Sequence, residues 1–224
     1  MAPRARIADT IGVNGWVFIE EYEPDAESFR AFEGLGIVDR VEGLNPIQKL
    51  VPKNREEAPP NTYSGNFGTA EFPLHTDLAH WAVPPRYLAL RCQRGSPRIV
   101  TRICDSRGVT HSIGTERLRM ALVQPRRPMR DQRQLLRLLD RTDDDLLFRL
   151  RWDEIYLKPA TSIAIEVFHR IRSSLSTTAP QEIRLVRRGD TLIIDNWRCL
   201  HGRSSATNDS TPREIDRAYL SSLI

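Results

Sequence analysis

The sequence predicts a mainly β protein with flanking helices (α+β), built as an antiparallel barrel or jelly roll. Two observations favour this fold class: the β-forming runs are short and separated by turn residues, and they do not alternate regularly with helices. A doubly wound parallel sheet would need that alternation. The chain also carries no internal repeat and no low-complexity segment.

The first half of the chain predicts three strands, one helix and a long loop. Residues 15–22 are rich in β-formers, and a helix is expected to open at Pro24-Asp25. Prolines, asparagines and glycines dominate residues 51–68, which indicates a surface loop of the kind that often carries binding residues. Residues 87–93 and 99–104 are short β-like runs, which we expect to pair as strands.

The second half predicts helices that interrupt the β framework. Helices are expected over residues 115–124, 131–139 and 162–175, with a return to strand at 147–152. Further strands are expected at 182–186, 191–195 and 215–220. At 224 residues, the chain fits one domain over residues 1–224, with a helical insertion at about 115–178.

The net charge of +4 and the pI near 9.2 raise the hypothesis of a nucleic-acid partner. The distribution of charge argues against it, because the only lysines are Lys49, Lys53 and Lys158, and the arginines of residues 137–151 alternate with aspartates. We interpret this pattern as a solvated mixed-charge surface. No nucleic-acid partner is therefore expected.

The cysteines and the hydropathy pattern exclude further classes. Cys92, Cys104 and Cys199 are widely spaced and form no CxxC motif, so neither a disulfide framework nor a zinc knuckle is predicted. No run approaches the ~18 apolar residues of a membrane helix, and the first residues lack the apolar core of a secretory signal. We expect a cytoplasmic protein with no membrane partner.

The chemistry-bearing pattern pairs His75-Thr-Asp77 with a distant His201-Gly-Arg203. Side chains at i and i+2 of a strand share one face, so His75 and Asp77 can grip one ion, with His201 coming from a neighbouring strand. Two neutral imidazoles and one carboxylate leave open coordination positions, as iron(II) oxygenases require. A lone His-x-Asp pair is more often a surface hydrogen bond, so this interpretation needs support from other residues of the chain.

Two arginines supply that support, Arg213 and Arg217, with i, i+4 spacing on a predicted strand. Each guanidinium offers a planar fork that matches a carboxylate. A dicarboxylate co-substrate that chelates the metal at one end needs a cation at the other. Either arginine can supply it.

Taken together, the motif at 75–77, the Gly-Asp turn and strand at 189–195, the DNxxxxHGR run at 195–203 and the paired arginines resemble a known family. This is the iron(II)/2-oxoglutarate oxygenases of the taurine dioxygenase-like and clavaminate synthase-like group, and the resemblance spans residues 67–220. It implies a double-stranded β-helix (jelly roll, cupin-like) core. It also implies Fe(II), 2-oxoglutarate and O2 as metal and co-substrates.

The resemblance assigns roles to individual residues. His75, Asp77 and His201 would be the metal ligands and the catalytic centre, and Arg213 would hold 2-oxoglutarate. Thr101 matches a co-substrate-binding threonine, although an ordinary β-branched strand residue explains it equally well. The carboxylate of Asp77 argues against a halogenase, because those relatives have a small residue there.

For the substrate, the resemblance implies that Arg217 contacts the co-substrate or an anionic substrate group, and that Asn66 holds a substrate amine. The expected activity is hydroxylation of an unactivated carbon in a small molecule, such as an amino acid or a natural-product precursor. Desaturation, cyclisation or epoxidation on the same scaffold, a non-catalytic cupin-like metal-binding module and nucleic-acid demethylation are alternatives. None of His80, His111 and His169 is assigned a chemical role, although a position behind a metal ligand or in a substrate-binding loop is an alternative for His80.

Overall fold

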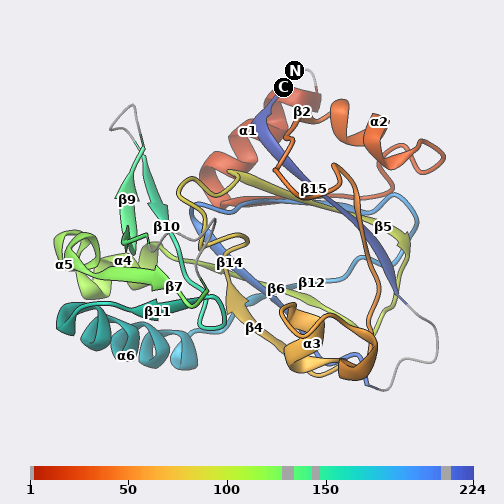
Figure 1. The fold of residues 1–224 in the computed structure, drawn as a ribbon. Helices are drawn as coiled ribbons and strands as arrows, with labels where there is room; N and C mark the ends of the chain where they lie inside the picture. Colours follow the sequence, from red (N-terminus) through yellow and green to blue (C-terminus); the bar gives the residue numbers. More distant parts are fainter. Residues whose placement is uncertain (1–2, 128–133, 143–146, 208–212) are drawn as a thin grey trace.

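The computed structural model describes residues 3–127, 134–142, 147–207 and 213–224, and its main body consists of two antiparallel sheets that face each other (Figure 1). The larger sheet has the order β1-β13-β5-β15-β2, and β3 also pairs with β15. Its strands are β1 (Trp16–Ile19), β2 (Gly36–Val38), β3 (Gln48–Leu50), β5 (Tyr87–Arg94), β13 (Thr191–Asp195) and β15 (Glu214–Leu223). The smaller sheet, ordered β12-β6-β14-β4, has the strands β4 (Phe72–His75), β6 (Thr101–Asp105), β12 (Gln181–Ile183) and β14 (Cys199–Arg203). The predicted mainly β, antiparallel fold class is confirmed.

The alternation of side chains along β5 explains how the larger sheet is buried on both faces. Leu88 and Leu90 point between the sheets, where they share a core with Ile103 of β6. Tyr87 and Ala89 point to the other face. The near-continuous apolar run of β5 therefore reflects two covered faces.

Two helices cover the outer face of the larger sheet (Figure 1). They are α1 (Pro3–Asn14) and α2 (Ser28–Glu33). Ile11 of α1 and Phe32 of α2 pack in one core with Ala89 and Ile193 of the sheet. The helix expected from Pro24 begins four residues later, at Ser28.

The described residues between Arg107 and Thr177 form a second body beside the sheets, which we call the lateral lobe (left in Figure 1). It has its own core, which includes Leu118, Trp152 and Phe168. Its helices are α4 (Arg107–Ile113), α5 (Thr115–Met120) and α6 (Ser162–Thr177). Its strands are β7 (Leu122–Pro125), β8 (Leu136–Arg137), β9 (Leu139–Arg141), β10 (Phe148–Leu150) and β11 (Leu157–Pro159).

The lateral lobe corrects two helix predictions. The helix expected over 115–124 ends at Met120 and gives way to β7, and the one expected over 131–139 is replaced by β8 and the start of β9. Residues 131–133 lie outside the described part. These residues form short strands rather than helices because β7 pairs with β8 and β11. Such tertiary pairing is not visible in the local periodicity of the sequence. The helix at 162–175 and the strand at 147–152 are confirmed by α6 and β10.

The predicted pairing of residues 87–93 with 99–104 is wrong. β5 lies in the larger sheet, between β13 and β15, whereas β6 lies in the smaller sheet, between β12 and β14. The segment from Gly95 carries the chain from one sheet to the other. A Cβ at Gly95 would lie 2.1 Å from the backbone oxygen of Val186, so only glycine fits this close approach.

The loop expected at residues 51–68 contains two short helical turns, η1 (Arg55–Glu57) and α3 (Tyr63–Phe67). Thr62 caps α3, because its hydroxyl accepts a hydrogen bond from the backbone N–H of Gly65. In Figure 1, α3 lies against β4 of the smaller sheet.

Within the described residues, none of the helices has the length and hydropathy needed to cross a bilayer.

Candidate metal centre

The three predicted metal ligands converge at one end of the smaller sheet. His201 of β14 lies directly opposite His75, the last residue of β4, in the antiparallel register. Their ring centroids are 4.4 Å apart. Asp77 lies two residues beyond the end of β4, so strand alternation does not explain its position as the sequence pattern had suggested. Other contacts must hold it.

Asp77 is held by the side chain of Asn196, which is fully buried. The Asn196 amide oxygen accepts from the Asp77 N–H at 2.7 Å, and its NH2 group donates to the Asp77 carbonyl at 3.0 Å. The residue before Asp77 is fixed as well: Thr76 N–H donates to Trp152 O at 2.8 Å, and Trp152 N–H donates to the Thr76 hydroxyl at 3.0 Å. The lateral lobe and the turn after β13 thus position the carboxylate together.

The geometry of the three side chains suits a metal ion. Asp77 Oδ1 lies 3.3 Å from His75 Nε2 and 3.4 Å from His201 Nε2. Ligand atoms about 2.1 Å from a first-row divalent ion and at right angles would be about 3 Å apart, which agrees with these spacings. His75 Nδ1 lies 2.9 Å from the carbonyl of Pro73, and this contact leaves Nε2 free to coordinate.

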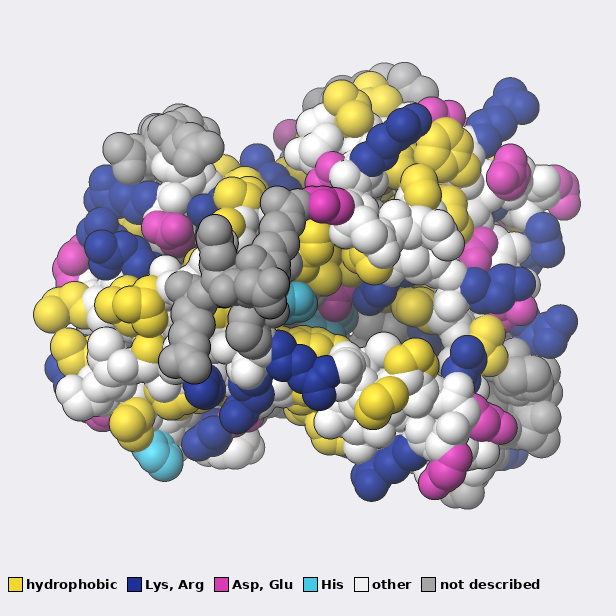
Figure 2. Space-filling view, viewed as in Figure 1, with side chains coloured by type: hydrophobic (Ala, Val, Ile, Leu, Met, Phe, Trp, Pro, Cys, Tyr) yellow, Lys and Arg dark blue, Asp and Glu magenta, His cyan; other side chains and the backbone are white. Residues whose placement is uncertain are grey.

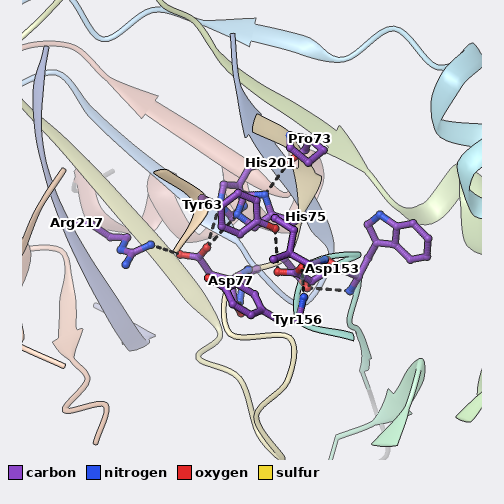
Figure 3. A network of polar contacts seen from close by, with 12 residues as sticks. Tyr63, Pro73, His75, Asp77, Asp153, Tyr156, His201 and Arg217 are labelled. Carbon is purple, nitrogen blue, oxygen red and sulfur yellow. Dashed lines mark hydrogen bonds and ion pairs between the residues drawn. The ribbon is translucent and has the colours of Figure 1, made fainter. Parts of the chain in front are cut away.

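The second carboxylate oxygen of Asp77 is already satisfied by the larger sheet. Arg217 Nη1 donates to Asp77 Oδ2 at 3.0 Å (Figure 3). The Tyr219 hydroxyl donates to the same atom at 2.8 Å. Burial opposes ionisation of Asp77, but the neighbouring Arg217 and His201 outweigh it and hold the pKa of the carboxyl well below its usual value. Asp77 is therefore an anion with one oxygen oriented towards both imidazoles.

Two tyrosines that the sequence patterns did not indicate, Tyr63 and Tyr156, line the same cavity as His75. The Tyr63 ring stacks on the imidazole of His75, with centroids 4.0 Å apart and planes inclined by 23°. Its hydroxyl donates to Asp153 Oδ2 at 2.9 Å (Figure 3). The Tyr156 hydroxyl donates to Asn61 O at 2.6 Å. These bonds tie the 59–67 loop to the lateral lobe. No local sequence pattern predicts these two hydrogen bonds, because the donor and the acceptor of each are about 90 residues apart in the chain.

A cavity of about 520 Å3 opens beside the three predicted ligands, within the range of small-molecule sites. Arg213, just before β15, and Thr101 of β6 both line it and are buried. Arg213 Nη2 donates to Thr101 Oγ1 at 3.2 Å across the space between the sheets. Arg217 lines the cavity as well, so both predicted arginines reach it.

Asn66 does not reach the cavity. Its side-chain amide donates to Thr62 O at 2.8 Å and to Pro60 O at 3.4 Å, and it is not among the lining residues. The amide stabilises the α3 turn, so its position does not support the expected contact with a substrate amine.

The charged side chains on the visible face (Figure 2) are distributed as the sequence predicted, with both signs mixed. On the face shown in Figure 2, basic and acidic side chains are interspersed, and histidine side chains are visible at the bottom of a central hollow. Several surface arginines are paired with carboxylates, for example Arg117 with Glu166 and Arg119 with Glu116. No basic stripe is formed on the face shown.

Comparison with protein-family models and with curated protein sequences gives no match. Solved structures do match. An asparagine oxygenase in complex with Fe(II), 3-hydroxyasparagine and succinate aligns with 97% of this chain and 78% of its own, at 19% identity and a TM-score of 0.67. PvcB from Pseudomonas aeruginosa aligns with 98% of this chain and 80% of its own, at 16% identity and a TM-score of 0.68. The chain has the fold of these proteins.

A further structure, of the non-heme iron oxygenase OrfP with Fe and alpha-ketoglutaric acid, aligns with 79% of this chain and 57% of its own, at 21% identity and a TM-score of 0.60. PvcB is described as an Fe, alpha-ketoglutarate dependent oxygenase from an isonitrile synthetic pathway. At these identities, the likeness establishes the fold. The chemistry of this chain has to be argued from its own residues.

Proposed function

We propose that this protein is an Fe(II)- and 2-oxoglutarate-dependent oxygenase that hydroxylates a small, amino-acid-like molecule. The observation that carries the proposal is the orientation of Asp77. One carboxylate oxygen lies 3.3 and 3.4 Å from the two histidine Nε2 atoms, and the other is held by Arg217 and Tyr219. The same cavity contains the buried Arg213.

In this proposal, His75, Asp77 and His201 hold the iron on one face and leave the cavity side open. The bound iron and 2-oxoglutarate supply the oxidising power with O2, so that 2-oxoglutarate is decarboxylated to succinate while a carbon–hydrogen bond of the substrate becomes a carbon–hydroxyl bond. The protein supplies orientation and exclusion of water. Tyr63, stacked on His75, shields that ligand from solvent.

Arg213 and Thr101 form the proposed anchor for the far carboxylate of 2-oxoglutarate. The guanidinium offers a planar fork of donors, and the threonine hydroxyl is already within hydrogen-bond distance of it. Both side chains are buried, so the charge-assisted bond forms away from competing water. A non-catalytic metal-binding module has no use for such an anchor.

Arg217 is the proposed contact for an anionic group of the substrate. Its guanidinium reaches Asp77 and, through Nε at 3.2 Å, the amide oxygen of Gln48. Gln48 and Asp77 thereby orient the fork towards the cavity that Arg217 lines. An amino-acid-like substrate is supported by the neighbours, which include an asparagine oxygenase and OrfP bound to (3S)-hydroxy-L-Arg.

Anaerobic titration tests the proposal. Adding 2-oxoglutarate to the Fe(II)-loaded protein should produce a visible charge-transfer absorption band, and His201→Ala should not show it. With oxygen and a suitable substrate, succinate should be released. A folded wild-type protein that binds Fe(II) but shows no band with 2-oxoglutarate contradicts the proposed function.

A further inference from the structure

Arg151, in the lateral lobe, is fully buried yet contacts only backbone carbonyls among the described residues. Its Nη1 donates to Ala79 O at 2.9 Å and to Trp81 O at 2.6 Å, and its Nη2 donates to Ala82 O at 3.1 Å. Its Nε donates to Arg137 O at 2.8 Å. One guanidinium therefore ties the lobe to the loop that comes after the metal-ligand segment.

Burying a guanidinium without a carboxylate partner is unfavourable, so its hydrogen bonds must compensate. Those bonds all go to main-chain oxygens, and three of them are in residues 79–82. This loop forms a turn in which Trp81 N–H donates to Leu78 O at 2.9 Å, and no strand or helix includes it. Arg151 fixes the backbone of this loop around His80, because it donates hydrogen bonds to the carbonyls of the residues on both sides, Ala79 and Trp81.

His80 lies in the loop segment that Arg151 holds, and its side chain lines the cavity. Its ring packs beside Tyr156, with centroids 5.1 Å apart. Nδ1 is buried without a hydrogen-bond partner among the described residues, so Nε2 is the polar atom that His80 can offer to a ligand. Burial and the charge of Arg151 lower the pKa of His80 to about 4, and the imidazole is neutral at neutral pH.

The carboxylates of the cavity leave nothing to pair with a cationic substrate group. Among the described lining residues they are Asp77 and Asp153. Asp77 faces the metal ligands and Arg217. Asp153 accepts from the Tyr63 hydroxyl and from the backbone N–H groups of Ile155 and Tyr156. The α-ammonium of an amino-acid substrate is balanced by the substrate's own carboxylate, whereas an additional cationic side chain would be desolvated in this cavity without a counter-charge.

From these contacts we infer that His80 is a specificity-determining residue: its Nε2 contacts an uncharged polar group at the side-chain end of the substrate, and Arg151 is the positioning residue that holds it there. This inference rests on the proposed function, and it narrows the substrate class from amino-acid-like molecules in general to those with a neutral, hydrogen-bonding side chain.

The test is an anaerobic titration of the Fe(II)- and 2-oxoglutarate-loaded protein with four probes: L-asparagine, L-glutamine, L-arginine and L-lysine. The shift of the charge-transfer band on probe binding gives each affinity. In the wild type, the tighter of the two amides should bind at least about tenfold more tightly than either cationic probe. His80→Ala should weaken amide binding about tenfold, the loss expected for one hydrogen bond in a buried site.

Arg151→Met should lose the same preference, and Arg151→Lys should recover part of it because an ammonium can still donate to some of the carbonyls. Arg91→Met is the matched control. Arg91 is equally buried and donates to the carbonyls of Tyr22, Glu23 and Ala26, but it does not line the cavity. It should lower the melting temperature and leave the preference intact.

Three results overturn the inference: no band shift with any probe, cationic probes bound as tightly as the amides, or an unchanged preference in His80→Ala. An equal loss of preference in Arg91→Met would show that Arg151 acts only through global stability. The proposed function fails separately, because its own signal is the band that appears with 2-oxoglutarate before any probe is added.

Discussion

The two sheets contribute different chemistry to the cavity. The smaller sheet supplies imidazoles from adjacent strands, so hydrogen-bond register alone sets His201 opposite His75. The larger sheet supplies the cations, with Arg217 on β15 and Arg213 just before it. Across the cavity, Arg217 donates to Asp77, just beyond the end of β4, and Arg213 donates to Thr101 of β6. We therefore expect changes in the first group to remove the metal and changes in the second to weaken the binding of anions.

The largest effect is expected for the metal ligands. Asp77→Ala should abolish 2-oxoglutarate turnover and Fe(II) binding, because it removes the oxygen between the two imidazoles and leaves Arg217 without its carboxylate partner. Fe(II) binding by calorimetry and succinate release measure this. Asp105→Asn, on β6 of the same sheet but outside the cavity lining, is the control and should retain both.

Arg213→Ala comes next and tests the larger sheet. Removing one partner of a buried charge pair costs about 2–5 kcal/mol, so 2-oxoglutarate should bind roughly 30-fold or more weakly, while Fe(II) affinity changes little. Thr101→Val should cost only ~1 kcal/mol. Equal losses in these two variants would contradict the assignment of Arg213 as the main anchor.

Asn196 belongs to neither sheet, because it lies in the turn from β13 of the larger sheet to β14 of the smaller one. Asn196→Ala should reduce Fe(II) affinity about 10- to 100-fold, the usual effect of losing a group that orients a metal ligand. Competition with a metallochromic chelator measures it. Unchanged affinity would mean that Arg217 and Tyr219 alone position Asp77.

The smallest effect concerns Asp105 and the pH dependence of stability. Burial raises the pKa of this carboxyl, but hydrogen bonds from Arg198 and Arg107 outweigh it and lower the pKa below the ordinary value of 3.8. A lowered folded pKa stabilises the fold above the unfolded value, and this contribution is lost as the pH falls through the folded value.

The wild type should therefore exceed Asp105→Asn in free energy of unfolding by up to ~1 kcal/mol at pH 7, and the difference should shrink below pH 4. Urea denaturation across pH measures it. A difference that stays constant down to pH 2 would show that the ion pairs with Arg198 and Arg107 are not its source.

Local sequence patterns were enough to predict several strands, one long helix and the residue types of the site. Runs of β-formers predicted β5, β13 and β15, apolar spacing predicted α6, and the motifs named the three side chains that converge. These signals are local, because a strand or helix is encoded in the order of neighbouring residues. The assignment of Arg213 to the co-substrate came from the family resemblance, since spacing alone left Arg213 and Arg217 open, and it stays a prediction until 2-oxoglutarate binding to Arg213→Ala is measured.

Which elements contact one another became clear from the three-dimensional packing. β6 lies in a different sheet from β5, although the sequence predicted that they pair. Asp77 is positioned by its hydrogen bonds with Asn196 and not by strand alternation. The packing also brings Tyr63 onto His75 and turns Asn66 back to its own loop. Each of these depends on packing between segments distant in the chain, where the free energy of burial and hydrogen bonding selects partners that local propensity does not encode.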